Sequence, residues 1–155
     1  MHLGCWRISR TGRSNGPRRD SGVTESDVLF DTWAWWEYLH QTPTGASLRM
    51  RYFVDGTARV HTSSLTIAEV SARLDADGAS DRIAPACSAI RRMSHLWDVT
   101  ADIAQEAGPI RRELRDRARS ASLADAIILV TARKAGARLV SADPAFRGIA
   151  GVISS

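Results

Sequence analysis

Short apolar runs alternate along this chain with segments in which apolar residues recur at helical spacing. The apolar runs predict strands at residues 28–30, 59–62, 97–99, 137–141 and 148–153. The helical segments predict helices at residues 32–40, 46–54, 66–74, 82–96, 101–117 and 122–136. Strands that alternate with helices favour a parallel sheet with helices on both faces. We therefore predict a Rossmann-like α/β fold of three layers, α/β/α, with a central parallel sheet of four or five strands.

Turn residues and one apolar run refine this pattern. Thr42–Gly45 is expected to break the chain after the first helix, and Gly136 is expected to close the 122–136 helix as its C′ glycine. Ile127–Val130 is apolar on every side of that helix, which is typical of a helix buried inside a layered fold.

Large aromatic side chains crowd the first predicted helix, which contains Trp33, Trp35 and Trp36. One short helix cannot bury three indoles on one stripe, so the core is expected to take one or two of them. The remainder is expected on an exposed patch for a dimer mate or an inhibitor protein. Trp97 is expected in the core, whereas His61 and His95 are expected at the surface or half-buried.

Length and charge indicate one domain with a basic extension. The chain has 155 residues and a net charge of +4. Residues 1–20 hold five arginines and one aspartate, while residues 21–155 hold 16 basic and 16 acidic residues. A Gly/Ser/Arg-rich segment with few apolar residues is typical of disorder, and it also has the charge to touch nucleic acid. We predict a disordered extension at residues 1–27 and one domain at residues 28–155.

The two cysteines and the hydropathy pattern bear on location. Cys5 and Cys87 form neither a metal-ligand spacing nor a framework of bridges, which is typical of a reducing cytoplasm. No apolar run approaches the ~20 residues that cross a bilayer. The N-terminal residues lack the apolar segment of a secretory signal. A cytoplasmic protein that does not enter the membrane is expected.

Four acidic residues stand where an apolar run meets the start of a helix, namely Asp31, Glu69, Asp125 and Asp143. Such junctions gather along one edge of a parallel sheet, where ligand sites form. Carboxylates gathered there without a cation repel one another, and the repulsion raises some of their pKa values. Mg²⁺ and Mn²⁺ prefer carboxylate oxygens, activate water and offset charge on a phosphate under attack. The pattern predicts metal-assisted phosphodiester hydrolysis.

Each acid also has a structural alternative. Thr66 with Glu69, and Ser122 with Asp125, fit the capping-box pattern. Asp143 before a proline fits an N-cap, and Asp31 fits a cap of the first helix. Taken singly, each acid favours the cap. Taken together, they favour a shared site, because all four strand-to-helix junctions carry an acid where other residue types would cap equally well.

Three segments resemble the PIN-domain ribonucleases, and most nearly the VapC-type toxins of bacterial toxin–antitoxin pairs. They are VLFDT at 28–32, SSLTIAEV at 63–70 and SLADAIILVTARKAGARLVSAD at 122–143. The resemblance implies cleavage of RNA with Mg²⁺ or Mn²⁺ as cofactor, inhibition by a cognate antitoxin protein and assembly as a homodimer.

The same resemblance assigns roles to individual residues. Asp31 and Asp125 match the family's central metal ligands. Glu69 and Asp143 match the acids that complete the pocket and orient metal or attacking water. We therefore expect all four acids to be catalytic, with Asp31, Asp125 and Asp143 on the metal. Two hydroxyl residues next to these acids are expected to contact the substrate, namely Thr32 and Ser141, the latter where the family usually has threonine.

An arginine cluster precedes Asp125 and consists of Arg111, Arg112, Arg115, Arg117 and Arg119. These side chains suit contacts to RNA phosphates beside the metal. Their spacings equally suit a solvated helix face, where a pair such as Glu113 and Arg117 contributes little. Arg119, nearest to Asp125 in sequence, is the strongest candidate for binding the substrate.

Two alternatives remain beside the toxin ribonuclease. One is a non-catalytic PIN-like module that binds RNA or a protein. The other is a different Mg²⁺-dependent phosphohydrolase on a Rossmann-like sheet. Phosphatases of the haloacid-dehalogenase kind need a second aspartate two residues after the first, and position 33 is tryptophan. A response-regulator receiver is disfavoured because the sole lysine, Lys134, lies within a predicted helix.

Overall fold

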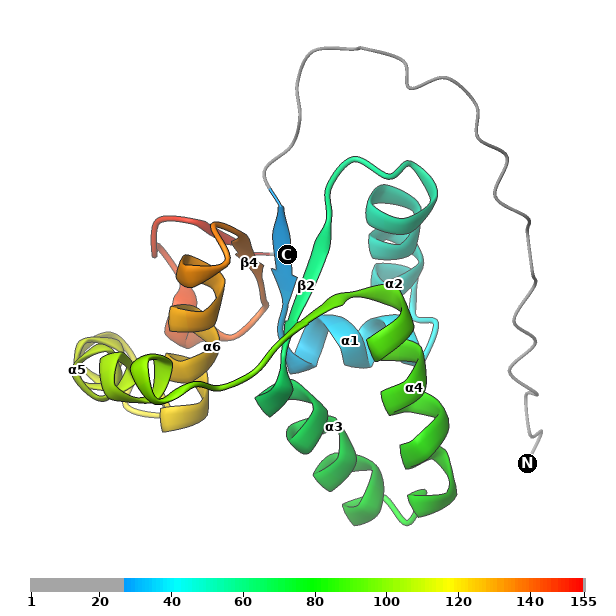
Figure 1. The fold of residues 1–155 in the computed structure, drawn as a ribbon, viewed down its shortest axis with the longest axis horizontal. Coiled ribbons are helices and arrows are strands. Elements are labelled where there is room, and N and C mark those ends of the chain that lie inside the picture. The colour runs from blue at the N-terminus through cyan, green and yellow to red at the C-terminus, as the bar shows by residue number, and fades with distance from the viewer. Residues whose placement is uncertain (1–26, 155) are drawn as a thin grey trace.

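The computed structural model describes residues 27–154 (Figure 1). Five parallel strands form one sheet in the order β3-β2-β1-β4-β5. The strands are β1 (Val28–Phe30), β2 (Val60–Ser63), β3 (His95–Trp97), β4 (Arg138–Val140) and β5 (Val152–Ile153). Val28 pairs with Val60 on one side and with Arg138 on the other, so β1 lies at the centre. The predicted disorder of residues 1–27 concerns residues outside those described, Asp27 excepted.

Helices cover both faces of the sheet, which confirms the predicted three-layer α/β/α architecture. Figure 1 shows α5 and α6 on one face and α1 to α4 on the other. The α-helices are α1 (Thr32–Leu39), α2 (Pro43–Leu48), α3 (Ser64–Ala76), α4 (Ile83–Met93), α5 (Ala101–Arg117) and α6 (Leu123–Lys134). A π-helix, η1 (Arg49–Val54), continues α2, and two 3-10 helices are η2 (Ser80–Arg82) and η3 (Pro144–Phe146). Within residues 27–154 none of these helices is long and apolar enough to cross a bilayer.

Two apolar clusters hold the layers together, one on each face of the sheet. Alternate residues of β1 point to opposite faces because strand side chains alternate. Leu29 packs in the cluster under α5 and α6, and its neighbours Val28 and Phe30 pack in the cluster under α1, α3 and α4. All three strand residues are buried, as the central strand of a parallel sheet requires. The predicted burial of the Ile127–Val130 segment of α6 is confirmed for its last three residues.

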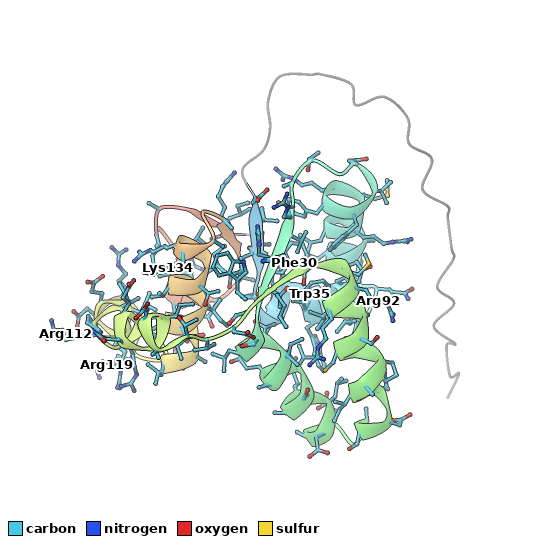
Figure 2. All side chains as sticks on the ribbon, viewed as in Figure 1. Phe30, Trp35, Arg92, Arg112, Arg119 and Lys134 are labelled. Atoms are coloured by element: carbon cyan, nitrogen blue, oxygen red, sulfur yellow. The ribbon has the colours of Figure 1, made fainter. Side chains whose placement is uncertain are left out.

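Trp35 is the tryptophan of α1 that is buried in the core. Its Nε1 donates to Oγ1 of Thr62 at 2.9 Å, and its ring meets Phe30 edge-on at 5.4 Å (Figure 2). Trp36 is half-buried, with its ring stacked on His40 at 4.2 Å and the Arg73 guanidinium 3.8 Å from its centroid. The expectation of one or two buried indoles is confirmed. A partner surface at the others stays a prediction.

The break predicted at Thr42–Gly45 also begins α2, whereas the sequence pattern predicted a helix only from residue 46. The Thr42 hydroxyl accepts a hydrogen bond from the Gly45 N–H at 3.0 Å, and proline at the first helical position needs no donor. Gly45 approaches α1 so closely that a Cβ there would lie 2.0 Å from the carbonyl oxygen of Glu37. Only glycine fits this crossing, so the same residues end one helix and start the next.

The third strand lies two residues earlier than predicted, at His95–Trp97, because α4 already ends at Met93. β3 is an edge strand, so Trp97 is half-buried and its assignment to the core was wrong. His61 was expected at the surface or half-buried, and it is instead 4% exposed. Both of its ring nitrogens have partners, Asp27 and Trp97, which allows its burial.

Candidate active site

The fold brings all four predicted acids to the edge of the sheet where the strands end. Asp31 directly follows β1, and Asp143 lies three residues after β4. Glu69 stands on α3, which begins directly after β2, and Asp125 stands in the first turn of α6, whose far end leads into β4. The charges of Glu69 and Asp143 raise the pKa of Asp31, and the charge of Asp125 raises the pKa of Glu69. The predicted gathering of acids at the carboxyl edge is therefore present in the structure.

Asp31 is the buried centre of this group, only 6% exposed. Its Oδ1 accepts a hydrogen bond from the Ala34 N–H at 2.8 Å, so it caps α1 as the structural alternative predicted. Burial is the main cause that raises the pKa of Asp31 to about 7, and the negative charges of Glu69 and Asp143 add to it, while hydrogen bonds from Ser141 and Ala34 oppose the shift. Near neutral pH this carboxyl group can thus both take up and release a proton, and next to a cation it can act as a ligand.

Glu69 does not cap its helix. α3 begins at Ser64 with Ser63 as the N-cap, whose hydroxyl accepts from the Leu65 N–H at 3.3 Å. Glu69 is therefore beyond the first turn, and the capping-box alternative that paired it with Thr66 was wrong. Its Oε2 instead accepts a hydrogen bond from the Thr32 hydroxyl. Burial raises the pKa of Glu69, and the charge of Asp125 raises it further, while the Thr32 bond opposes the shift.

Asp125 and Asp143 both fulfil their predicted capping roles. Oδ2 of Asp125 accepts from the Ser122 N–H at 2.7 Å and from the Ser122 hydroxyl at 2.8 Å, which completes a capping box. Oδ1 of Asp143 accepts from the Ala145 N–H at 2.7 Å and caps η3. Each cap uses one carboxylate oxygen. Capping therefore leaves the second oxygen of each residue available to a ligand.

Thr32 and Ser141, predicted to bind substrate, lie inside this group and hold its acids in place. Thr32 donates to Glu69 from the first position of α1. Ser141 is 1% exposed, bonds to Asp31 and accepts a hydrogen bond from the Asp143 N–H at 3.0 Å. Ser141 thereby connects the acid after β1 to the acid after β4. Contact of either hydroxyl with substrate stays a prediction.

Arg119 is exposed in the connection between α5 and α6. Figure 2 shows Arg119 and Arg112 at the outer side of α5, away from Phe30 on the central strand. No hydrogen bond or ion pair joins Arg119 to the four acids among residues 27–154. The structure does not bring it into the acid cluster, and its role in binding substrate stays a prediction.

The donor chemistry of this edge fits a hard divalent cation. The side chains are carboxylates and hydroxyls, and the buried Asp31 lacks a positive partner among the groups that shift its pKa. In the described part of the chain, however, no three His, Cys, Asp or Glu side chains are already grouped so as to hold a metal ion. Asp125 and Asp143 each use one carboxylate oxygen in a cap and are not grouped with Asp31 as ligands of one cation in this part of the chain.

Sequence reasoning missed the state of Thr66. Its hydroxyl is fully buried and has no hydrogen-bond partner among residues 27–154. Thr66 stands three residues before Glu69, which imitates a capping box. The signal that distinguishes the two interpretations is Ser63, which also suits an N-cap and lies one turn earlier, directly after the apolar strand.

The layered fold and the acidic edge define an α/β domain with a site at the carboxyl ends of its strands. A family model described as PIN domain matches residues 28–152. The chain therefore belongs to the PIN domain family.

Solved structures share this fold. A toxin–antitoxin complex from Klebsiella pneumoniae contains a chain 25% identical, with a TM-score of 0.62, over 83% of this chain and 97% of that one. VapC20 of Mycobacterium tuberculosis, described as a Sarcin-Ricin loop cleaving toxin, is 24% identical with a TM-score of 0.60, over 81% and 98%. A DNA-bound VapBC from Salmonella typhimurium is 19% identical with a TM-score of 0.64, over 84% and 98%. A comparison with curated proteins gives no match. The predicted resemblance to VapC-type PIN proteins is confirmed.

Proposed function

We propose that this PIN-domain protein is a Mg²⁺- or Mn²⁺-dependent endoribonuclease and the toxin of a type II toxin–antitoxin pair. One observation carries the proposal. Asp31 is buried at the carboxyl edge of the sheet with its pKa raised to about 7, and Glu69 and Asp143 act on it as like charges. A strongly perturbed carboxyl group beside further acids is typical of a catalytic site rather than of a structural one.

A divalent cation would relieve the repulsion in this cluster. Asp31, Asp125 and Asp143 would hold it through carboxylate oxygens, the last two by their oxygens outside the caps. Bound Mg²⁺ or Mn²⁺ supplies an activated water and offsets charge on the phosphate under attack. The proposed metal site thus uses three of the four acids that the alternating sequence pattern singled out.

Glu69 is suited to orient the attacking water and to accept its proton. Its pKa is raised by burial, which brings it nearer to the pH at which a general base works best. The Thr32 hydroxyl fixes the orientation of its carboxylate. Ser141 does the same for Asp31 and ties it to the backbone of Asp143. Substrate contacts are assigned to Thr32, Ser141 and Arg119.

The solved neighbours support a protein partner. The Klebsiella pneumoniae structure is a toxin–antitoxin complex, and the Rickettsia felis and Salmonella typhimurium neighbours are VapBC assemblies. We infer that a cognate antitoxin binds and inhibits this chain in the cytoplasm. A homodimer belongs to the same proposal.

Cleavage of a structured RNA pool tests the activity. Wild type, Asp31→Asn and Asp125→Asn are compared with Mg²⁺, with Mn²⁺ and with chelator, and Asp77→Asn on the surface after α3 is the matched control. Asparagine preserves size and capping while it removes the ligand charge. We expect each site variant to lose about 100-fold or more in rate, and the control to cut like wild type. Equal cutting by all four proteins would mean a contaminating nuclease and would defeat the proposed mechanism.

Thermal unfolding tests the metal without relying on activity. Mg²⁺ should raise the Tm of wild type, because a ligand that binds only the folded state stabilises it by about 2.7 kcal/mol at 100 times its Kd. The same addition should leave the Tm of Asp31→Asn nearly unchanged. A wild type that shows no shift up to millimolar Mn²⁺ would contradict a metal site made of these acids.

A non-catalytic binding module is the second candidate. The observation that favours it is the absence, within residues 27–154, of a metal-holding group already in place. This candidate predicts RNA or protein binding that survives both chelator and the Asp31→Asn change. Chelator and the Asp31→Asn change separate the two candidates, because both abolish cleavage by a nuclease but leave binding by a non-catalytic module intact.

A further inference from the structure

The charges of α5 are separated along its length. Residues 101–110 contain two acidic and no basic side chains, and residues 111–119 contain five arginines and two acidic side chains. The arginines are Arg111, Arg112, Arg115, Arg117 and Arg119, which together we call the α5 arginine surface. The helix thus has an acidic first half and a basic second half.

The basic half of α5 lies at the end of the molecule that holds the acid cluster. α5 and α6 are packed against each other, and the ion pair from Glu106 to Lys134 at 2.5 Å joins the first half of α5 to the last residue of α6. The two helices are therefore antiparallel. The last turn of α5 consequently stands beside the first turn of α6, which carries Asp125. Figure 2 shows Lys134 and Arg119 at opposite ends of this helix pair.

All five arginines are exposed and make no ion pair in the described part of the chain. Glu113 stands four residues before Arg117, yet no ion pair forms between them. Arg111 and Arg115 are one turn apart, and with Arg112 they lie on one exposed side of α5, Arg112 opposite the buried residues and Arg111 beside them. Three guanidinium groups are thus presented together to solvent.

The helix macrodipole explains only part of this cluster. Cations are favoured in the last turn of a helix, which accounts for Arg115 and Arg117. The effect fades beyond that turn, so it does not account for Arg111 and Arg112. Arg119 lies past the helix end. A planar guanidinium fork matches a phosphate better than an ammonium group does.

We propose that the α5 arginine surface binds the phosphodiester backbone of RNA and leads the strand to the acid cluster beside the first turn of α6. This inference rests on the proposed function, since it supplies the substrate-binding surface of that same site. Arg111, Arg112 and Arg115 contact phosphates along α5. Arg117 and Arg119 continue the track toward Asp125.

RNA binding measured in chelator tests this surface without any cleavage. The probe is a single-stranded RNA of mixed sequence and about 16 nucleotides, with a DNA of the same sequence as the second arm. The variant combines Arg111→Gln, Arg112→Gln and Arg115→Gln. The matched control combines Arg49→Gln, Arg91→Gln and Arg133→Gln, which removes the same charge from exposed positions elsewhere. Thermal unfolding of both proteins verifies that they fold.

We expect the α5 variant to lose at least about 10-fold in affinity for the RNA, and its plot of log affinity against log salt to become shallower by about 2. The control should lose far less. Equal losses in the two proteins would show that net charge alone matters and would overturn the proposal.

An α5 variant that binds RNA as tightly as wild type would overturn it too, in favour of an acidic protein partner. DNA bound as tightly as RNA would overturn the assignment to RNA. A failed cleavage test leaves this binding result standing, so the two failures are distinguishable.

Discussion

Two polar clusters stand at opposite ends of the same sheet, and they differ in how their groups are paired. Near the start of β1 and β2, Nε2 of His61 lies 3.1 Å from Oδ2 of Asp27, and Nδ1 of His61 accepts from the Trp97 indole at 3.0 Å. Oδ1 of Asp27 accepts from the Arg59 N–H at 3.2 Å. The His61 hydrogen bond lowers the pKa of Asp27. Both ring nitrogens of the buried histidine thus have partners.

The cluster at the carboxyl edge has the opposite character. Burial and like charges raise the pKa values of Asp31 and Glu69, and the buried Thr66 hydroxyl has no partner among residues 27–154. Proteins tend to break their own packing rules at functional sites and to obey them elsewhere. The difference indicates that the paired cluster serves stability and that the carboxyl-edge cluster is maintained at a cost to stability.

The largest effect expected from this comparison is an increase in the free energy of unfolding when Asp31 is changed to Asn (Asp31→Asn). The pKa of Asp31 is about 7 in the folded protein, against an ordinary value of 3.8. A group whose folded-state pKa is raised stabilises the fold when protonated, so wild type loses this contribution as the pH rises from about 4 to 7. Asparagine has no charge to bury and retains the cap. At about 1.4 kcal/mol for each pH unit, the variant should be more stable at pH 8 by up to about 4 kcal/mol.

Urea unfolding in chelator at a series of pH values measures this difference. The advantage of Asp31→Asn should shrink steadily below pH 7 and vanish near pH 4. An advantage that is independent of pH would mean that the change acts through packing rather than through the buried charge. A variant less stable than wild type at pH 8 would remove the contrast between the two clusters.

His61→Phe should lower the free energy of unfolding, whereas Asp31→Asn should raise it. Phenylalanine keeps an aromatic ring at this position, somewhat larger than that of histidine, but Asp27 and the Trp97 N–H both lose their His61 partner. Two lost hydrogen bonds, one of them to a charged group, should lower the free energy of unfolding by about 2–3 kcal/mol. His95→Phe on the neighbouring edge strand is the control, because His95 is exposed and should tolerate the change. Urea unfolding at pH 7 gives both values, and equal losses in the two variants would show that aromatic packing rather than the hydrogen bonds decides the result.

The sequence predicts well wherever local signals agree. α6 begins at a capping box on Ser122, and Gly136 with a φ of 63° follows its end, so a short stretch contains every signal that its boundaries need. The four acids reach one edge of the sheet because the alternation of strands and helices implies a parallel sheet. Topology therefore predicts where these residues gather.

The sequence predicts side-chain contacts poorly where the two partners are far apart along the chain. The Thr32 bond to Glu69 spans 37 residues, and the Asp27 bond to His61 spans 34. No local pattern contains either pair. The edge strand β3 has one side without a neighbouring strand, so burial does not impose a clear alternation on His95–Trp97 and its position was misjudged by two residues. Side-chain pairing and sheet edges therefore require the folded structure.

The smallest effect comes from two buried threonines that differ only in their partners. Thr66 and Thr131 are both fully buried within helices. The Thr131 hydroxyl donates to the Ile127 carbonyl at 2.7 Å, whereas the Thr66 hydroxyl donates to nothing among residues 27–154. Valine has nearly the same shape and is also branched at Cβ. Thr66→Val should therefore raise the free energy of unfolding by about 1 kcal/mol, and Thr131→Val should lower it by about as much, as measured by urea unfolding. If Thr66→Val is instead destabilising, the hydroxyl has a partner such as an ordered water, and the carboxyl edge is better satisfied than its raised pKa values imply.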